Sequence, residues 1–189
     1  MEAFFNWTRA RGDVLIFVTV GTHEQPFDRL IINIDGLKGK GVIQDDVVIQ
    51  TGFSNYQPKN CEWKKLFSYQ EMMVNVAEAR IVITHGGPSS FFMPLQVGKI
   101  PVVVPRQKKF GEHVNDHQVD FARAVAERKG NIIVIEKLEQ LEKVIMEYES
   151  IVRAMPKELQ SNNAKFNETF ASLVEELFDT KLKSDIPGK

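Results

Sequence analysis

The chain lacks the features of a secreted, membrane-spanning or nucleic-acid-binding protein. Its single cysteine, Cys61, excludes a disulfide within the chain and is typical of a reducing compartment. No apolar run approaches the ~18 residues that a spanning helix needs, and residues 1–13 lack the apolar segment of a signal peptide. The 24 basic and 25 acidic residues leave a net charge of −1, which gives no reason to expect nucleic-acid binding. We therefore expect a cytoplasmic protein.

What is present is the composition of an ordinary globular protein, with 43% hydrophobic and 26% charged residues. A length of 189 residues suits one domain with a sizeable core. We expect residues 1–13 to form a flexible leader, residues 14–178 a single domain, and residues 179–189 a flexible tail.

Strand and helix patterns alternate along the expected domain. The β-branched run at residues 14–20 predicts a buried strand, and Gly21 ends it. Further strands are predicted at residues 46–51, 65–68, 80–84, 100–104 and 131–135. Helices are predicted from Phe27 to the glycines at 36, 39 and 41, and at residues 70–79, 89–97, 114–128, 138–153 and 156–178. This alternation predicts the α/β class with a doubly wound parallel sheet.

Glycines follow two of the predicted strands. They belong to Gly21-Thr22 after the first strand, and to His85-Gly86-Gly87 after the strand at 80–84. Because the carboxyl ends of parallel strands form the ligand-binding edge of such a sheet, we expect the two turns to share that edge. Backbone N–H groups and a helix N-terminus at each turn could face an anion, and Ser89 or Ser90 can cap the following helix. Two such turns on one edge suggest a diphosphate, although neither matches the dinucleotide-binding or Walker pattern.

Histidine is concentrated at the same edge. Three of the four histidines lie within residues 85–117, and the fourth, His23, follows the first strand. His113 and His117 are four residues apart near an expected helix start, a spacing that permits zinc chelation. However, Val114 stands where a zinc-hydrolase helix carries a glutamate. We therefore favour hydrogen bonding to polyol hydroxyls and helix capping over metal binding.

A short basic patch follows the strand at 100–104. It consists of Arg106, Lys108 and Lys109, and its place between two candidate anion sites suggests that it balances phosphate charge. The nearby Gly-Pro-Ser-Ser segment does not match the G-x-S-x-G nucleophile elbow, which argues against a serine hydrolase.

Taken together, these segments resemble a known family. The stretches IFVTVGTHEQPFDRLI, ITHGGPSSFFMPLQVGKIPVVVPR and QKKFGEHVNDHQ are similar to the C-terminal domain of family 28 glycosyltransferases, the donor-binding half of a GT-B fold. The likeness is greatest to PssE-type subunits of bacterial exopolysaccharide and capsule synthesis. These are relatives of the catalytic subunit of the eukaryotic dolichol-linked UDP-GlcNAc transferase. The resemblance implies a Rossmann-like doubly wound sheet over residues 16–178.

The resemblance also implies a two-component inverting glycosyltransferase. The chain would bind a UDP-sugar and transfer the sugar to a polyprenyl-diphosphate-linked acceptor. A membrane-anchored PssD-type subunit would bind that lipid-linked acceptor and hold the chain at the inner face of the plasma membrane. No metal or other cofactor is expected.

Site residues follow from the resemblance by position. The expected donor-binding residues are Gly21 and Thr22 by the donor phosphates, His85, Gly86, Gly87, Ser89 and Ser90 in the second glycine loop, Arg106 in the loop that lines the uracil pocket, and Glu112 and His113 holding sugar hydroxyls. His23 or Glu24 could assist as a catalytic base, although the partner subunit is expected to supply it. Met93 replaces a glutamate that binds ribose in many relatives, so ribose recognition must differ here.

Two other functions stay open. The chain could be a non-catalytic enhancer subunit that activates a partner transferase, which the methionine at position 93 favours. It could also be a UDP-sugar epimerase or hydrolase, although such an enzyme needs a second domain. The transferred sugar is not specified by the sequence: galactose, glucuronate, glucose and N-acetylglucosamine all remain open.

Overall fold

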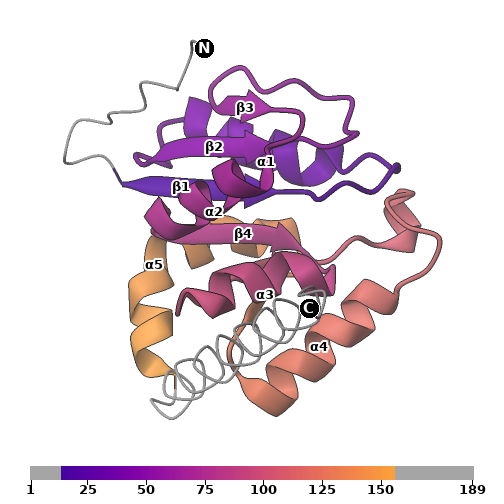
Figure 1. The fold of residues 1–189 in the computed structure, drawn as a ribbon, viewed down its shortest axis with the longest axis vertical. Helices are drawn as coiled ribbons and strands as arrows, with labels where there is room; N and C mark the ends of the chain where they lie inside the picture. The colour runs from indigo at the N-terminus through magenta and orange to yellow at the C-terminus, as the bar shows by residue number, and fades with distance from the viewer. Residues whose placement is uncertain (1–13, 156–189) are drawn as a thin grey trace, which may run out of the picture.

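A parallel sheet of six strands forms the centre of the computed structural model, which describes residues 14–155. The strand order is β3-β2-β1-β4-β5-β6, and the stack from β3 to β4 is visible in Figure 1. The strands are β1 (Leu15–Thr19), β2 (Asp46–Gln50), β3 (Glu62–Lys64), β4 (Ile81–His85), β5 (Val102–Val104) and β6 (Ile133–Val134). Every neighbouring pair is parallel, which confirms the predicted α/β class and doubly wound sheet.

Helices cover both faces of this sheet. They are α1 (Asp28–Gly39), α2 (Tyr69–Glu78), α3 (Pro88–Gln96), α4 (His117–Lys129) and α5 (Leu141–Ala154), with 3₁₀ turns η1 (Lys108–Phe110) and η2 (Leu138–Gln140). None of the helices in residues 14–155 is long and apolar enough to cross a membrane. The leader at 1–13, the helix predicted at 156–178 and the tail at 179–189 lie outside the described residues.

The apolar run of β1 is continuous because both of its faces are covered. Ile16 and Val18 pack with α1 and α5 in one core cluster, whereas Leu15 and Phe17 pack with α2 in another. A third cluster lies between α3, α4 and β5. Each fully buried aliphatic or aromatic side chain contributes about 1.5–3 kcal/mol to folding, so these clusters fix the sheet that carries the loops described below.

The strand order changes direction between β1 and β4. From β1 the chain continues outward to β2 and β3, and it then returns to β4 and continues outward to β5 and β6 on the other side. Thr19 of β1 pairs in register with Thr84 of β4, so the turns after these two strands emerge side by side. This is the topological switch point at which open α/β sheets bind ligands.

Several element boundaries differ from those predicted. The third strand is at 62–64 rather than 65–68, because Val48 to Gln50 of β2 pair with Glu62 to Lys64. Gly36 lies inside α1, since one glycine costs a helix only about 1 kcal/mol and Leu37 beyond it is buried. Helix α4 begins at His117 rather than near 114, because hydrogen bonds hold residues 107–112 in a tight loop before it.

A buried carboxylate on α1 anchors the loop between β2 and β3. Asp35 is 1% exposed and accepts hydrogen bonds from the Asn60 N–H (2.7 Å), the Tyr56 hydroxyl (2.8 Å) and the Lys59 N–H (3.0 Å). Burial alone would raise the pKa of Asp35, but these hydrogen bonds hold it below its usual value.

Replacing this carboxylate by an amide should loosen the loop. In Asp35→Asn the new NH₂ group faces N–H and O–H donors, so we expect the free energy of unfolding to fall by about 2 kcal/mol in urea titration. Glu127→Gln makes the same change at an exposed position of α4 and should shift the unfolding free energy by less than about 0.5 kcal/mol. Equal stability of the two variants would contradict the anchoring role.

Candidate functional site

A cavity of 660 Å³ opens at the switch point of the sheet. One wall is polar and comes from the turns after β1 and β4; its residues are Gly21, Thr22, His23, Glu24, His85, Ser89 and Ser90. The other wall is largely apolar and comes from the start of α2 and from α3; its residues are Phe67, Tyr69, Met72 and Met93. The volume lies in the range of small-molecule sites.

The two glycine turns meet around the imidazole of His85. A Cβ atom on Gly21 would lie 2.4 Å from His85 Cε1, and one on Gly87 would lie 2.5 Å from His85 Nε2. Gly21 also has a φ of +76°, which side chains rarely adopt. The glycines are therefore required to admit the histidine ring between the turns, in addition to any approach of a ligand.

His85 is held in its neutral form. Burial, and secondarily the charge of Arg106, lower the pKa of His85 to about 4. Its Nε2 lies 3.3 Å from the Ser90 hydroxyl, and its buried Nδ1 has no hydrogen-bond partner among residues 14–155. A neutral imidazole with a cavity-lining edge can exchange hydrogen bonds with a ligand without changing the charge of the site.

The low pKa of His85 predicts acid sensitivity. The folded-state pKa of about 4 lies below the unfolded value of 6.5, so the unfolded chain binds the proton more tightly. Stability should be fully present above pH 6.5 and should fall by about 3 kcal/mol as the pH drops through 4. Urea unfolding of wild type and His85→Gln at pH 7 and pH 4 measures this, because only wild type should lose that increment beyond the carboxylate effects common to both.

The remaining glycine of the second turn serves close packing. A Cβ atom on Gly86 would lie 2.9 Å from Cβ of Gln118 and 3.1 Å from Cβ of Pro105. The turn after β4 is thereby pressed against the start of α4 and the end of β5. Gly86 thus allows the turn after β4 to pack closely against the start of α4 and the end of β5.

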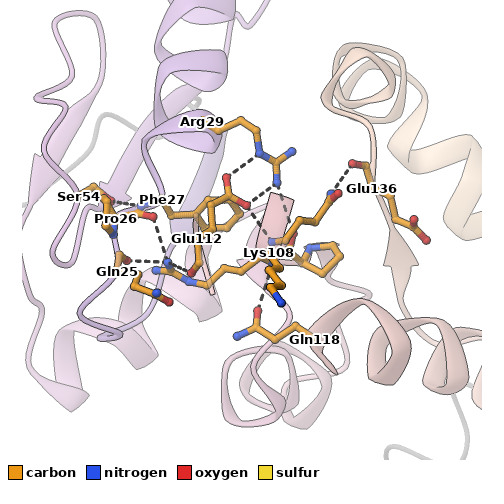
Figure 2. Close-up of polar contacts among 12 residues, drawn as sticks. Gln25, Pro26, Phe27, Arg29, Ser54, Lys108, Glu112, Gln118 and Glu136 are labelled. Atoms are coloured by element: carbon orange, nitrogen blue, oxygen red, sulfur yellow. Dashed lines mark hydrogen bonds and ion pairs between the residues drawn. The ribbon is translucent and has the colours of Figure 1, made fainter. Parts of the chain in front are cut away.

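Arg106 supports the loops around the cavity from inside the protein. Its side chain is fully buried, and the guanidinium donates to four backbone carbonyls instead of lining the cavity. Three acceptors belong to the β1–α1 segment and one to the loop after β5; they are Val20 (2.9 Å), Gln25 (2.7 Å), Pro26 (3.3 Å) and Glu112 (3.1 Å). The ring centroid of Phe27 lies 4.9 Å from the guanidinium carbon, and Figure 2 shows Phe27 close to Gln25, Pro26 and Glu112.

Glu112 is likewise engaged inside the protein. Its carboxylate is 96% buried and receives Arg29 Nε (2.7 Å) and Nη2 (3.0 Å) together with the Gln107 N–H (3.0 Å). This bidentate pair joins α1 to the loop after β5 (Figure 2). The arrangement makes Glu112 a support of the loop, with its oxygens already occupied by protein donors.

Arg106 should not be replaceable by lysine. An ammonium presents its donors from a single nitrogen and cannot span carbonyls on two segments. We expect Arg106→Lys to lower the unfolding free energy by about 2 kcal/mol and to speed amide hydrogen exchange in residues 20–27. Arg153→Lys, an exposed change on α5, is the matched control, and unchanged exchange in Arg106→Lys would contradict the clamp.

His23 and Glu24 both line the polar wall of the cavity. Nδ1 of His23 accepts the Gln25 N–H at 3.2 Å, so the neutral ring carries its proton on Nε2. In that tautomer His23 is a hydrogen-bond donor and not a base. Glu24 is exposed and keeps a carboxylate at the cavity.

His113 and His117 do not share a helical face, because only His117 belongs to α4. Their rings are nevertheless in contact, with centroids 4.5 Å apart. Within the described part of the chain, no group of three or more His, Cys, Asp or Glu side chains could hold a metal ion.

Sequence reasoning missed the apolar wall. Phe67 and Tyr69 flank Ser68, the N-cap of α2, whose capping box with Glu71 turns the start of the helix. The amide of Gln50 links this segment to β1, because its oxygen accepts the Phe67 N–H and its nitrogen donates to Thr19. The available signals were the capping-box spacing after an aromatic residue and a polar glutamine at the end of a buried strand.

The chain belongs to a known family. Residues 15–177 match the model of the glycosyltransferase family 28 C-terminal domain. Among curated proteins, none matches the chain by sequence.

Solved structures show the same fold. The glycotransferase of kitacinnamycin superposes with a TM-score of 0.62 at 18% identity, covering 91% of this chain and 43% of that one. CalG4, the calicheamicin glycosyltransferase, gives 0.57 at 16% identity, covering 96% and 45%. SsfS6 of Streptomyces sp. SF2575, complexed with thymidine diphosphate, gives 0.51 at 17% identity, covering 87% and 39%.

These comparisons define the class of the domain. It is a Rossmann-like α/β domain of the GT-B glycosyltransferase fold and corresponds to the C-terminal half of that fold. The chain spans less than half the length of each of these solved structures.

Proposed function

We propose that this chain is the UDP-sugar-binding, catalytic subunit of a two-component inverting glycosyltransferase. The single observation that carries the proposal is the cavity at the switch point of a family 28 domain, which is lined by polar groups from the turns after β1 and β4 and by apolar side chains of α2 and α3. A nucleoside diphosphate has the same division between an apolar base and an anionic diphosphate. The thymidine diphosphate in SsfS6 supports this class of ligand.

The diphosphate would lie against the polar wall. Helix α3 begins at Pro88 with Gly87 as N-cap, and no side chain caps its first turn. Its N-terminus therefore offers N–H groups and the positive end of the helix dipole beside the hydroxyls of Ser89 and Ser90. These groups would stabilise the negative charge that develops on the leaving UDP.

The uracil ring of UDP would lie against the apolar wall. Tyr69 is 72% exposed and Phe67 is half-buried, so the uracil ring can cover aromatic surface that is otherwise open to water. Met93 offers no oxygen to the ribose hydroxyls. The ribose hydroxyls would therefore be held by other polar groups that line the cavity.

The acceptor would come with a partner. In the proposed mechanism an acceptor hydroxyl attacks the anomeric carbon, the bond from that carbon to UDP breaks, and a base removes the hydroxyl proton. His23 presents a donor on this side, so the base is assigned to a PssD-type membrane-anchored subunit that also binds the polyprenyl-diphosphate-linked sugar. Both the cytoplasmic location at the inner membrane face and the role in exopolysaccharide or capsule synthesis belong to this proposal.

The second candidate is a non-catalytic enhancer of such a partner. The methionine at the ribose position favours it, because it removes a strong contact to the nucleotide. The enhancer predicts that the isolated chain does not bind UDP and that activity remains with the partner alone.

Calorimetric titration of the chain with UDP separates the two candidates. Donor binding predicts a saturable Kd of about 1 mM or tighter, and about fivefold weaker binding in Ser90→Ala, because one hydroxyl contact to phosphate is lost. Ser150→Ala on exposed α5 is the matched control. No binding by the chain alone or with its partner present would overturn the donor-site assignment.

A further inference from the structure

Three histidines from separate segments form a continuous row, defined here as His23, His113 and His117. The ring centroids of His23 and His113 are 4.7 Å apart, and those of His113 and His117 are 4.5 Å apart. His23 lines the cavity, His113 is only 9% exposed, and His117 lies at the surface. The histidine row therefore leads from the wall of the cavity to solvent.

The backbone orients the donors of this row. Nδ1 of His23 accepts the Gln25 N–H at 3.2 Å, and Nδ1 of His113 accepts the Asn115 N–H at 3.5 Å. The neutral rings of His23 and His113 therefore carry their protons on Nε2, and these two N–H donors belong to rings in contact. His117 instead donates through Nδ1 to the amide oxygen of Asn115. No ion pair joins any of the three rings to a carboxylate in residues 14–155, so the donors have no anionic partner in the protein.

The electrostatic surroundings favour an anion. Burial lowers the pKa of His113, and the neighbouring His117, His23 and Arg106 lower it further. His85 also lies within electrostatic range of His23 and His113. The acidic groups nearby in the chain are Glu24, exposed beside His23; Glu112, paired with Arg29; Asp116, which accepts the Lys108 N–H; and Asp120 in the first turn of α4.

We propose that the histidine row binds a phosphate or diphosphate group, with proton uptake on binding. A dianion would accept the Nε2–H donors of His23 and His113. Its charge would favour protonation of the rings, which replaces the backbone hydrogen bonds that their Nδ1 atoms accept. If the proposed function holds, the group has two sources: the leaving diphosphate of the donor, or the diphosphate of the lipid-linked acceptor. Both offer the same chemistry to imidazolium groups.

NMR of the histidine Cε1–H signals in the full chain, titrated over pH with and without inorganic pyrophosphate, tests this site. Because the protonated form binds the anion about tenfold more tightly, the pKa of His113 should rise by about one unit when pyrophosphate is bound. His117→Asn, a change at an exposed position, should weaken pyrophosphate binding about fivefold at pH 6.5. Lys143→Gln removes an exposed positive charge on α5 and should leave the affinity unchanged.

An unmoved pKa of His113, or equal pyrophosphate affinity in wild type and His117→Asn, would overturn the site. Addition of pyrophosphate to the UDP-saturated chain identifies the source. Independent binding assigns the row to the acceptor diphosphate, whereas mutual displacement assigns it to the donor. If UDP does not bind but pyrophosphate still shifts the pKa of His113, the result contradicts the donor function and supports the anion site at the histidine row.

Discussion

The buried guanidinium of Arg106 is the constraint on which the rest of the site depends. It lies at the end of β5 and donates to carbonyls of the β1–α1 segment and of the loop that leads to α4. Burial lowers its pKa to about 10, which still leaves the group charged at neutral pH. Each carbonyl that it satisfies would otherwise be a buried acceptor without a donor, at a cost of about 1–3 kcal/mol. The loops of the polar wall can therefore be irregular and still occupy one conformation.

The sequence predicted the fold well because the buried strands carry an unbroken apolar signal. Residues 14–20 and 80–84 could be assigned to strands from β-branched runs alone, and their parallel pairing followed from the alternation with helices. The conformation of the loop before α4 was harder to predict. Its conformation depends on Arg29 and Arg106, which reach it from distant parts of the sequence, and no local spacing reports such contacts. Helix α4 consequently begins later than its polar and apolar pattern predicted.

Contacts between distant segments also limited the prediction of the site residues. The glycine turns could be placed at one edge of the sheet because topology alone brings Thr19 and Thr84 into register. The roles of Arg106 and Glu112 could not be predicted, because the sequence does not indicate whether a charged loop residue faces a ligand or the interior. The apolar wall needed the structure as well, because Phe67 and Tyr69 reach the cavity through the pairing of β3 with β2.

The histidines show how one edge of a sheet can combine neutral and titratable groups. His85 lies between two glycine turns, where burial keeps it uncharged across the physiological range. The row that starts at His23 leads outward, and its outer member meets solvent at the start of α4. A neutral donor in the cavity and protonatable donors at its rim can both bind phosphate oxygens, but only the rim can change its charge as an anion arrives. Because the Gln25 N–H directs the proton of neutral His23 onto Nε2, this ring offers a donor at the cavity, and the proposed mechanism takes its base from the partner subunit.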